Sequence, residues 1–219
     1  MRLIKLVLIG PPGSGKGTQA VRISERYSVP TISTGDILRA AVKARTPLGL
    51  AAQATMEAGG LVSDAMMIDL VRDRLAETDA AKGFILDGFP RTAAQADALE
   101  AMSTGQRPLA LVLNVPEGEL VRRLVSRRVC TGCKRLTTGG TSFGSEAELC
   151  SYCHAPLMMR ADDNEHTIKN RLATYRQTAD PLIQHYRSRG VLVSINGYQD
   201  TDEVTAEVFR VLDAVADGV

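Results

Sequence analysis

A glycine-rich segment near the start of the chain has the residue types that bind phosphate groups. It runs from Gly10 to Thr18 and reads GPPGSGKGT, directly after an apolar run over residues 3–9. Glycines let the backbone curl so that several N–H groups point at one phosphate, and Lys16 would reach the outer phosphate oxygens. The hydroxyl of Thr18 can ligate Mg²⁺. The segment therefore predicts a site for a polyphosphate and its Mg²⁺.

Four cysteines form a second group whose spacing points to chemistry. They lie in two Cys-x2-Cys pairs, Cys130 with Cys133 and Cys150 with Cys153, and sixteen residues separate the pairs. Such pairs let four thiolates converge on one tetrahedral ion. Four protein ligands leave no open position for a substrate, so the predicted site is structural. Zn²⁺ is the expected ion, although iron or cobalt would also suit four thiolates.

The overall composition restricts the kinds of partner and compartment. The 219 residues include 26 Lys and Arg against 25 Asp and Glu, a net charge of +1. This balance favours neither a nucleic acid nor a charged surface as partner, and no apolar run approaches the roughly 18 residues of a membrane span. The first apolar run leads into the glycine loop without a cleavage site, so we expect a cytoplasmic protein. Disulfides are disfavoured in that reducing compartment.

The hydrophobic pattern predicts the elements that position these residues. Apolar runs without polar alternation are typical of strands buried on both faces of a parallel sheet. Segments with helical spacing separate them, as in residues 63–75, where a candidate N-cap, Ser63, precedes apolar residues three or four apart. The pattern indicates an α/β fold with strands at Leu3–Ile9, Pro30–Ser33, Phe84–Asp87, Ala110–Val115 and Val191–Asn196.

Two segments interrupt this pattern. Gly35–Leu61 contains alanine-rich helical spacing between two glycine-containing turns. Cys130–Arg160 is turn-rich and contains all four cysteines. We expect both segments to be insertions in the core.

Details of the glycine loop and three later blocks resemble one family of enzymes. Gly17 stands between Lys16 and Thr18, whereas the strict pattern places Ser or Thr directly after the lysine, and this variant is similar to that of nucleoside monophosphate kinases. Blocks then follow in the order and at the separations of adenylate kinases, with ISTGDILR at 32–39, GLV at 60–62 and LDGFPRTAAQ at 86–95. The chain is identified as a member of that family as far as Asp213.

The resemblance implies a fold, an activity and partners. The fold is the P-loop nucleoside monophosphate kinase fold, with a five-stranded parallel sheet flanked by helices. The activity is reversible transfer of the γ-phosphoryl group of Mg·ATP to AMP, giving two ADP, by a monomer with structural Zn²⁺ in its lid. The implied division is a core of residues 1–32, 63–128 and 163–219, an AMP-binding insertion of residues 33–62, and a lid of residues 129–162.

The resemblance also assigns residues to the two nucleotides. ATP would contact Gly13, Ser14, Gly15, Lys16, Gly17, Thr18, Arg127, Thr137 and Gln199, and Thr18 with Asp87 would hold Mg²⁺ directly or through water. AMP would contact Thr34, Arg39, Gly60, Leu61, Val62, Gly88, Phe89, Pro90, Arg91, Gln95, Arg160 and Arg171. The residue types suit this task, because arginines fork onto a phosphate and a glutamine amide can pair with the donor and acceptor edge of adenine.

Plainer interpretations exist for three of these features. Arg39 also fits a solvated position on an alanine-rich helix, and Asp87 also fits a turn before Gly88. The resemblance implies a cis Phe89–Pro90 peptide bond, whereas sequence statistics alone favour trans.

Phosphoryl transfer asks the protein mainly for positioning and charge neutralisation, so no catalytic base or nucleophile is expected. Asp162 and Asp163 are expected to pair with arginines at the ends of the lid. Closure of the lid and of the AMP-binding insertion would exclude water. The resemblance places the following basic side chains around the transferring group: Lys16, Arg91, Arg123, Arg127, Arg160 and Arg171.

The middle of the lid departs from the family pattern. Thr137 and Thr138 stand where the family commonly has Tyr-His, and a glycine-rich stretch over residues 139–144 replaces a proline-rich tip. Aromatic stacking on adenine is therefore not expected at position 137, and Phe143 is the alternative candidate for it.

Two rival functions remain. One is a kinase for UMP, CMP or GMP; UMP/CMP kinases typically have Asn after the arginine that corresponds to Arg91 and a short lid, whereas this chain has Thr92 and a long lid. The other is an ATPase whose zinc knuckles bind nucleic acid, for which the lid has few aromatic residues.

Overall fold

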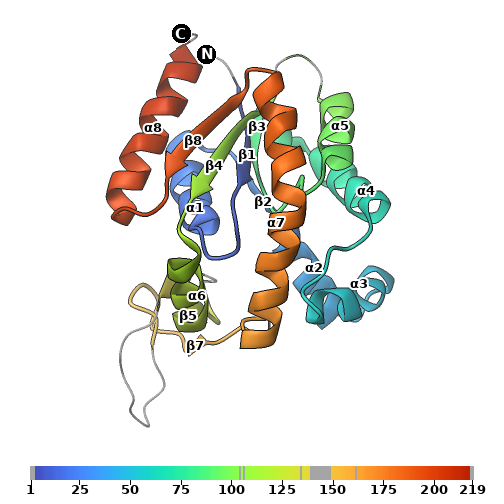
Figure 1. Ribbon diagram of the computed structural model, residues 1–219, viewed down its shortest axis with the longest axis vertical. Coiled ribbons are helices and arrows are strands. Elements are labelled where there is room, and N and C mark those ends of the chain that lie inside the picture. The colour runs from blue at the N-terminus through green and yellow to red at the C-terminus, as the bar shows by residue number, and fades with distance from the viewer. Residues whose placement is uncertain are drawn as a thin grey trace.

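A parallel sheet forms the centre of the protein (Figure 1). The computed structural model describes residues 3–103, 105, 107–133, 135–138, 149–160 and 162–217. The five strands have the order β2-β3-β1-β4-β8, and every pair is parallel. The predicted strands are confirmed, with small shifts at their ends. They are β1 (Ile4–Ile9), β2 (Thr31–Ser33), β3 (Gly83–Asp87), β4 (Leu109–Asn114) and β8 (Leu192–Asn196).

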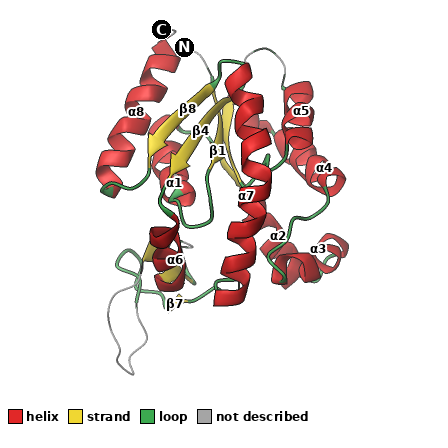
Figure 2. Ribbon diagram, viewed as in Figure 1, coloured by secondary structure: helices red, strands yellow, loops and turns green. Residues whose placement is uncertain are grey.

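Helices cover both faces of this sheet (Figure 2). Along β1, Leu6 and Leu8 pack toward helices α1 (Lys16–Tyr27) and α8 (Thr201–Asp217). Val7 and Ile9 pack on the opposite face, toward α4 (Asp64–Leu75), α5 (Ala93–Met102) and α7 (Glu165–Ser188). Because both sets are buried, the strands need apolar residues at successive positions, which explains their continuous apolar runs.

Helix α4 confirms the face that its spacing predicts. Met67 and Val71 are buried, and Leu70 and Leu75 pack against the same cluster. Ser63 is the N-cap residue, but its side chain accepts no capping hydrogen bond. A short 3-10 helix, η1 (Thr78–Lys82), leads from α4 to β3.

The first insertion consists of two helices, α2 (Thr34–Lys43) and α3 (Pro47–Glu57), as its alanine-rich spacing predicts. They pack closely because Gly49 lies against the end of α2. A Cβ atom on Gly49 would lie 2.2 Å from the carbonyl oxygen of Ala41. Thr46 caps α3 by accepting a hydrogen bond from the N–H of Gly49 at 3.1 Å. The contact leaves no space for a larger residue.

The second insertion contains a small antiparallel sheet that the sequence pattern did not predict. It follows α6 (Glu117–Ser126), and its strands have the order β6-β5-β7. The strands are short: β5 is Arg127–Cys130, β6 is Leu136–Thr138 and β7 is Leu157–Met158. This insertion is the region that the sequence indicated as the lid.

Helix α7 connects the core with both insertions. Its 24 residues span about 36 Å. Near its start, Thr167 donates a hydrogen bond to the carbonyl of Glu57 and Asn170 to that of Ala58, both at 3.1 Å. Toward its end, Leu182 and Tyr186 belong to the core cluster under the sheet. One rigid element thus fastens the end of the first insertion to the core.

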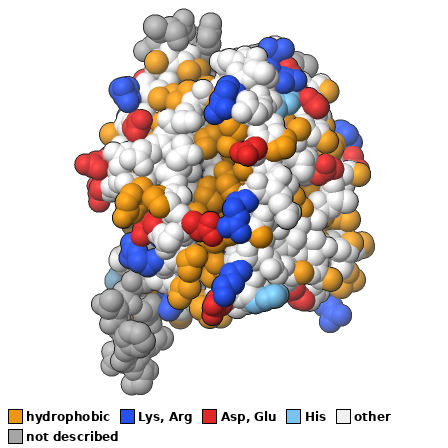
Figure 3. Space-filling model, in the orientation of Figure 1, with side chains coloured by type: hydrophobic (Ala, Val, Ile, Leu, Met, Phe, Trp, Pro, Cys, Tyr) orange, Lys and Arg blue, Asp and Glu red, His pale blue; other side chains and the backbone are white. Residues whose placement is uncertain are grey.

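The surface agrees with the near-neutral composition. The face drawn in Figure 3 carries acidic and basic side chains around a central band of hydrophobic side chains. Among the described residues, no helix is both long and apolar enough to cross a membrane.

The contact between α2 and α3 predicts that Gly49→Ala will destabilise the protein. The added methyl group would overlap the backbone of Ala41, and overpacking of this kind costs about 1–3 kcal/mol in the free energy of unfolding. Urea denaturation measures this difference. Gly118→Ala in α6 is the matched control, because a Cβ atom there meets nothing within 4 Å. An unchanged free energy of unfolding for Gly49→Ala would contradict the close packing.

Candidate active site and metal cluster

A large cleft lies at the carboxyl ends of the sheet strands, where open α/β sheets bind ligands. Its volume is about 1320 Å³. Residues of the glycine loop, of both insertions and of α7 line it. The cleft therefore brings together the segments that the sequence singled out.

The glycine loop joins the end of β1 to the start of α1, as predicted. Gly13 and Gly15 have φ angles of 86° and 96°, which glycine adopts at no steric cost. Ser14 is buried, and its N–H donates to the carbonyl of Pro11 at 3.1 Å. The loop ends at the N-terminus of α1, where free N–H groups and the helix dipole favour an anion.

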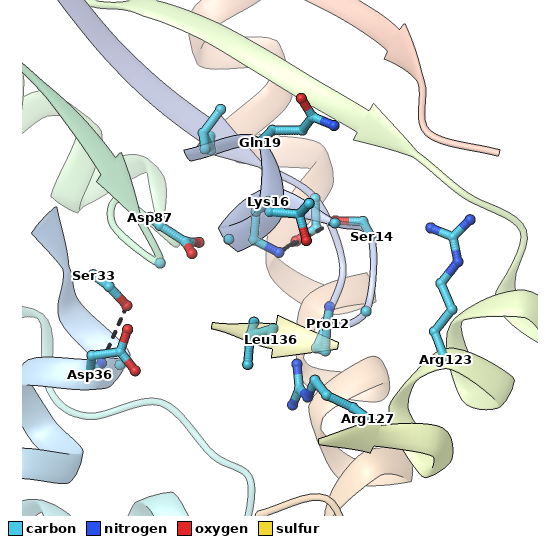
Figure 4. A pocket seen from close by; sticks show the side chains of 18 of the residues that line it. Pro12, Ser14, Lys16, Gln19, Ser33, Asp36, Asp87, Arg123, Arg127 and Leu136 are labelled. Carbon is cyan, nitrogen blue, oxygen red and sulfur yellow. Dashed lines mark hydrogen bonds between the residues drawn. The ribbon is translucent and has the colours of Figure 1, made fainter. Parts of the chain in front are cut away.

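Lys16 lies inside this loop (Figure 4). Its Nζ donates to the carbonyls of Gly10 at 2.8 Å and Pro11 at 2.9 Å. Burial lowers the pKa of Lys16 to about 8, against the opposing effect of Asp87. The ammonium group thus bonds to two neutral carbonyl oxygens, and a phosphate, which is charged, would compete with them for it.

A buried carboxylate holds two arginines at the base of the lid. The side chain of Asp163 has no exposed surface, and it accepts two hydrogen bonds from Arg127, that from Nε at 2.6 Å. Arg171 in α7 donates to the same carboxylate at 3.1 Å. The expectation that Asp163 pairs with a lid arginine is confirmed.

Asp162 is surrounded by arginines in the same way. Its carboxylate lies 3.5 Å from Arg39, 3.3 Å from Arg160 and 3.2 Å from Arg171. Burial lowers the pKa of Arg160 to about 10, and the charge of Arg39 adds to that shift. Among the residues that line the cleft, lysines and arginines outnumber aspartates and glutamates. This surplus of positive charge suits a polyanionic ligand.

A second pocket opens beside these arginines. Arg91 lies at its edge, and its Nε donates to the carbonyl of Gly88 at 2.8 Å. The expected AMP residues Thr34, Arg39, Gly60, Leu61, Val62, Gly88, Arg91, Gln95 and Arg171 all line this pocket, together with Leu38, Met56 and Met67. This second pocket is thus an apolar slot, and the side-chain amide of Gln95 and several arginines lie around it.

Pro90, Arg160 and Phe89 complete the expected AMP residues. Pro90 and Arg160 line the larger cleft, and the Phe89–Pro90 peptide bond is cis. The side chain of Phe89 is fully buried in the core cluster, so only its backbone is available to a ligand.

Arg123 lies at another side of the cleft. Its two terminal nitrogens donate to the carbonyl of Gly197 at 3.3 Å, and its Nε donates to Glu119 at 2.7 Å. Gln199 also lines the cleft and donates to the carbonyl of Asn196 at 2.9 Å. Arg123 therefore contacts the loop between β8 and α8, to which Gln199 belongs.

Sequence reasoning missed the residues through which the lid meets α1. Leu136 has Cδ1 at 3.3 Å from the position of a Cβ atom on Gly17, and Figure 4 shows it in the same space as Lys16 and Asp87. Arg135 forms an ion pair with Glu25 of α1 at 3.0 Å. It also lies 4.1 Å over the ring of Tyr152. None of these lid residues belongs to a motif, so the sequence did not indicate them.

The other residues expected from the lid and for Mg²⁺ also lie at the cleft. Thr137 in β6 lines it, whereas Phe143 lies outside the described residues. Thr18 and Asp87 line it beside the glycine loop, with a carboxylate oxygen of Asp87 3.7 Å from the Cβ position on Gly17. A hydroxyl and a carboxylate next to a phosphate loop fit a hard cation such as Mg²⁺.

The four cysteines converge as the spacing predicts. Their Sγ atoms all lie within 4.8 Å of one another, with 3.3 Å between Cys130 and Cys153 and 3.6 Å between Cys133 and Cys150. A tetrahedral ion with metal–sulfur distances near 2.3 Å needs sulfurs about 3.8 Å apart. The donor set fits Zn²⁺.

A second group of potential metal ligands does not fit an ion in this way. Asp97, Glu100 and His185 have ligand atoms within 4.8 Å of one another. Arg189 donates to Glu100 at 2.7 Å and to Asp97 at 3.4 Å, and Arg107 pairs with Glu100 at 2.6 Å, so both carboxylates already have cationic partners. This group is an ion-pair cluster between α5 and α7.

The glycine loop at the end of a parallel sheet, with a cation-rich cleft beside it, defines a P-loop nucleotide-binding protein. The model of the adenylate kinase family matches residues 8–191. Adenylate kinase from Thermodesulfovibrio yellowstonii is 46% identical over 213 residues, covering 96% of this chain and 99% of the relative. That from Desulfitobacterium hafniense is 47% identical over 214 residues, covering 94% and 96%. That from Clostridium acetobutylicum is 42% identical over 218 residues, covering 95% and 99%. The chain belongs to the adenylate kinase family and is a phosphotransferase.

Proposed function

We propose that the protein transfers the γ-phosphoryl group of Mg·ATP to AMP, reversibly, to give two ADP. Family membership supports this reaction. The observation that carries it is the arrangement of the cleft, in which arginines lie between the glycine loop and the apolar slot that ends at Gln95. One nucleotide would bind at each end, with the reacting phosphates among the arginines.

On the donor side, the glycine loop would bind the phosphates of ATP through Gly13 to Thr18. Lys16 would exchange its two carbonyl partners for β- and γ-phosphate oxygens, at the cost of two hydrogen bonds. Mg²⁺ bound to ATP, held by Thr18 and Asp87 directly or through water, supplies further charge neutralisation. Gln199 would contact ATP, with Thr137 on the lid side, and Arg123 would lie among the arginines around the transferring group.

On the acceptor side, Arg39 and Arg91 would hold the AMP phosphate and Gln95 its base. Arg127, Arg160 and Arg171 would neutralise the charge of the transferring group. Positioned charge of this kind is the main source of catalysis in phosphoryl transfer, where both oxygens need little activation. The aspartates act on the arginines: Asp162 and Asp163 hold them in place and take no proton from substrate.

A coupled assay of ADP formed from ATP and AMP tests this function, and GMP, CMP and UMP in place of AMP test the acceptor. AMP is the expected acceptor. Lys16→Met is expected to lower kcat/KM by about 10²–10³, as removal of one donor to a developing anion does, with an unchanged circular dichroism spectrum. Lys169→Met is the matched control, because Lys169 is exposed and, among the described residues, pairs with exposed Glu165 one turn earlier in α7. Full activity of Lys16→Met would refute the assignment.

We propose that residues 129–162 close over the donor nucleotide and residues 33–62 over the acceptor, against a core of residues 1–32, 63–128 and 163–219. The contacts of Leu136 with the glycine loop and of Arg135 with Glu25 support lid closure, because they join the lid to α1 beside the cleft. Closure would exclude water, the competing acceptor.

Fluorophores at exposed Leu149 in the lid and exposed Leu3 in the core report this motion. Single-molecule measurements are expected to give a narrower and shorter distance distribution when ATP and AMP are both present. A measurement with ATP alone shows how much of this change the donor nucleotide causes by itself. The same distribution with and without both nucleotides would rule out closure.

We propose that the cysteine cluster holds a structural Zn²⁺ and that the protein works in the reducing cytoplasm, where four thiols persist. The lid strands are too short to form a core of their own, so an ion would supply the missing stability.

Cys150→Ser is expected to lower the unfolding temperature by several degrees, at about 2–4 °C per kcal/mol for a chain of this length. Turnover measured well below that temperature is expected to change less, because the metal does no chemistry. Ser151→Ala is the control at the neighbouring exposed position. Metal analysis is expected to find zinc in the unaltered protein and in the control. Equal stability of Cys150→Ser with its metal retained would contradict a four-thiolate site.

A further inference from the structure

The side-chain amide of Gln95 is held between two groups of opposite hydrogen-bonding character. Its Oε1 accepts from the backbone N–H of Arg91 at 2.7 Å, and its Nε2 donates to Oδ1 of Asp64 at 2.7 Å. A backbone N–H can only donate and an ionised carboxylate can only accept. Turning the amide over would place oxygen against carboxylate and NH₂ against N–H. The two neighbours therefore fix one orientation of the amide, at a residue that is 2% exposed.

Asp64 is itself fixed by the starts of two helices. It is the first residue of α4, and its Oδ2 accepts from the hydroxyl of Thr92 at 2.9 Å. Thr92 is the N-cap of α5 and accepts in turn from the N–H of Gln95 at 3.2 Å. A carboxylate is also favoured electrostatically at a helix N-terminus. The orientation of Gln95 thus depends on a carboxylate that no motif indicated.

The fixed amide has one N–H and one lone pair of Oε1 left for a ligand, since a primary amide has two of each. Adenine presents a donor at N6 beside an acceptor at N1. Hypoxanthine and guanine present the reverse, an acceptor at O6 beside a donor at N1. A glutamine that turns over freely would satisfy either base, whereas a glutamine with a fixed amide satisfies only one. A site that leaves buried polar groups unpaired rejects the wrong ligand strongly.

We propose that Asp64 is a positioning residue that sets base specificity: by fixing the amide of Gln95, it selects a 6-aminopurine over a 6-oxopurine as acceptor monophosphate. This inference rests on the proposed function, in which Gln95 faces the acceptor base. Asp64 does not contact the base. It acts through Gln95, so its effect is on the ratio of kcat/KM for two acceptors and not on kcat/KM for one acceptor alone.

The test compares kcat/KM for AMP and inosine monophosphate, which has the same ring system and adds no amino group. Asp64→Asn keeps the shape of the side chain but offers an amide that can face Gln95 with either end. The ratio of AMP to inosine monophosphate activity is expected to fall about tenfold, the effect of losing one hydrogen bond to a charged group. Asp69→Asn is the control, since Asp69 lies in the same helix and pairs with exposed Arg72.

The outcomes separate the inference from the proposed function. If the unaltered protein phosphorylates neither AMP nor inosine monophosphate, the proposed function fails. If it prefers AMP and Asp64→Asn lowers both activities alike, so that the ratio stays within twofold, Asp64 is only structural and the inference is overturned. A lower ratio in Asp64→Asn with an unchanged ratio in Asp69→Asn supports it.

A second measurement needs no folded variant at Asp64. In ¹⁵N spectra of the unaltered protein, the side-chain amide protons of Gln95 are expected to exchange with solvent at least tenfold more slowly than those of Gln53. The amide of Gln53 is the matched case, because it also donates to a carboxylate, Glu57 at 2.8 Å, but in a solvent-exposed hydrogen bond on α3. Comparable exchange rates for the two side chains would show that Gln95 is not held and would overturn the inference.

Discussion

Crowded positive charge is the constraint on which the rest of this structure depends. Lys16, Arg160 and Arg171 share one cleft, and burial there lowers the pKa of each. Such groups repel one another and lose hydration, so a fold can hold them only with buried carboxylates between them. Asp163, with no exposed side-chain surface, supplies that carboxylate at the junction of the lid and α7. The surplus of positive charge that remains suits phosphate groups.

Local features made most of the fold predictable from the sequence. A strand covered by helices on both faces needs apolar residues at successive positions, and β1 apart from Lys5 and β4 up to Leu113 show this as apolar runs. The loop from Gly10 to Thr18 and the cysteine pairs are also local, because their chemistry depends on spacing within a few residues. The structure brings the residues assigned by resemblance to the cleft and to the second pocket beside it, apart from the side chain of Phe89, which packs in the core.

The rest could not be predicted because it depends on contacts between distant segments. Arg135 and Glu25 are 110 positions apart, and neither belongs to a motif. Asp64 and Gln95 are 31 positions apart, and an aspartate after a serine at a helix start is more simply explained as part of a cap. The lid strands have too few residues to show a period, so the sequence indicated turns where a small sheet exists.

Helix α7 has a consequence for how the two insertions move. It bonds to the end of α3 through Thr167 and Asn170, and to the base of the lid through Arg171. Both insertions are therefore attached to the first part of one helix, whose last part, from Pro181 on, packs in the core through Leu182 and Tyr186. The ion pair between Arg39 and Asp162 joins the two insertions directly as well, so a displacement of one insertion acts on the other through both links. The fold thus couples two distant parts of the chain through one continuous helix and one ion pair.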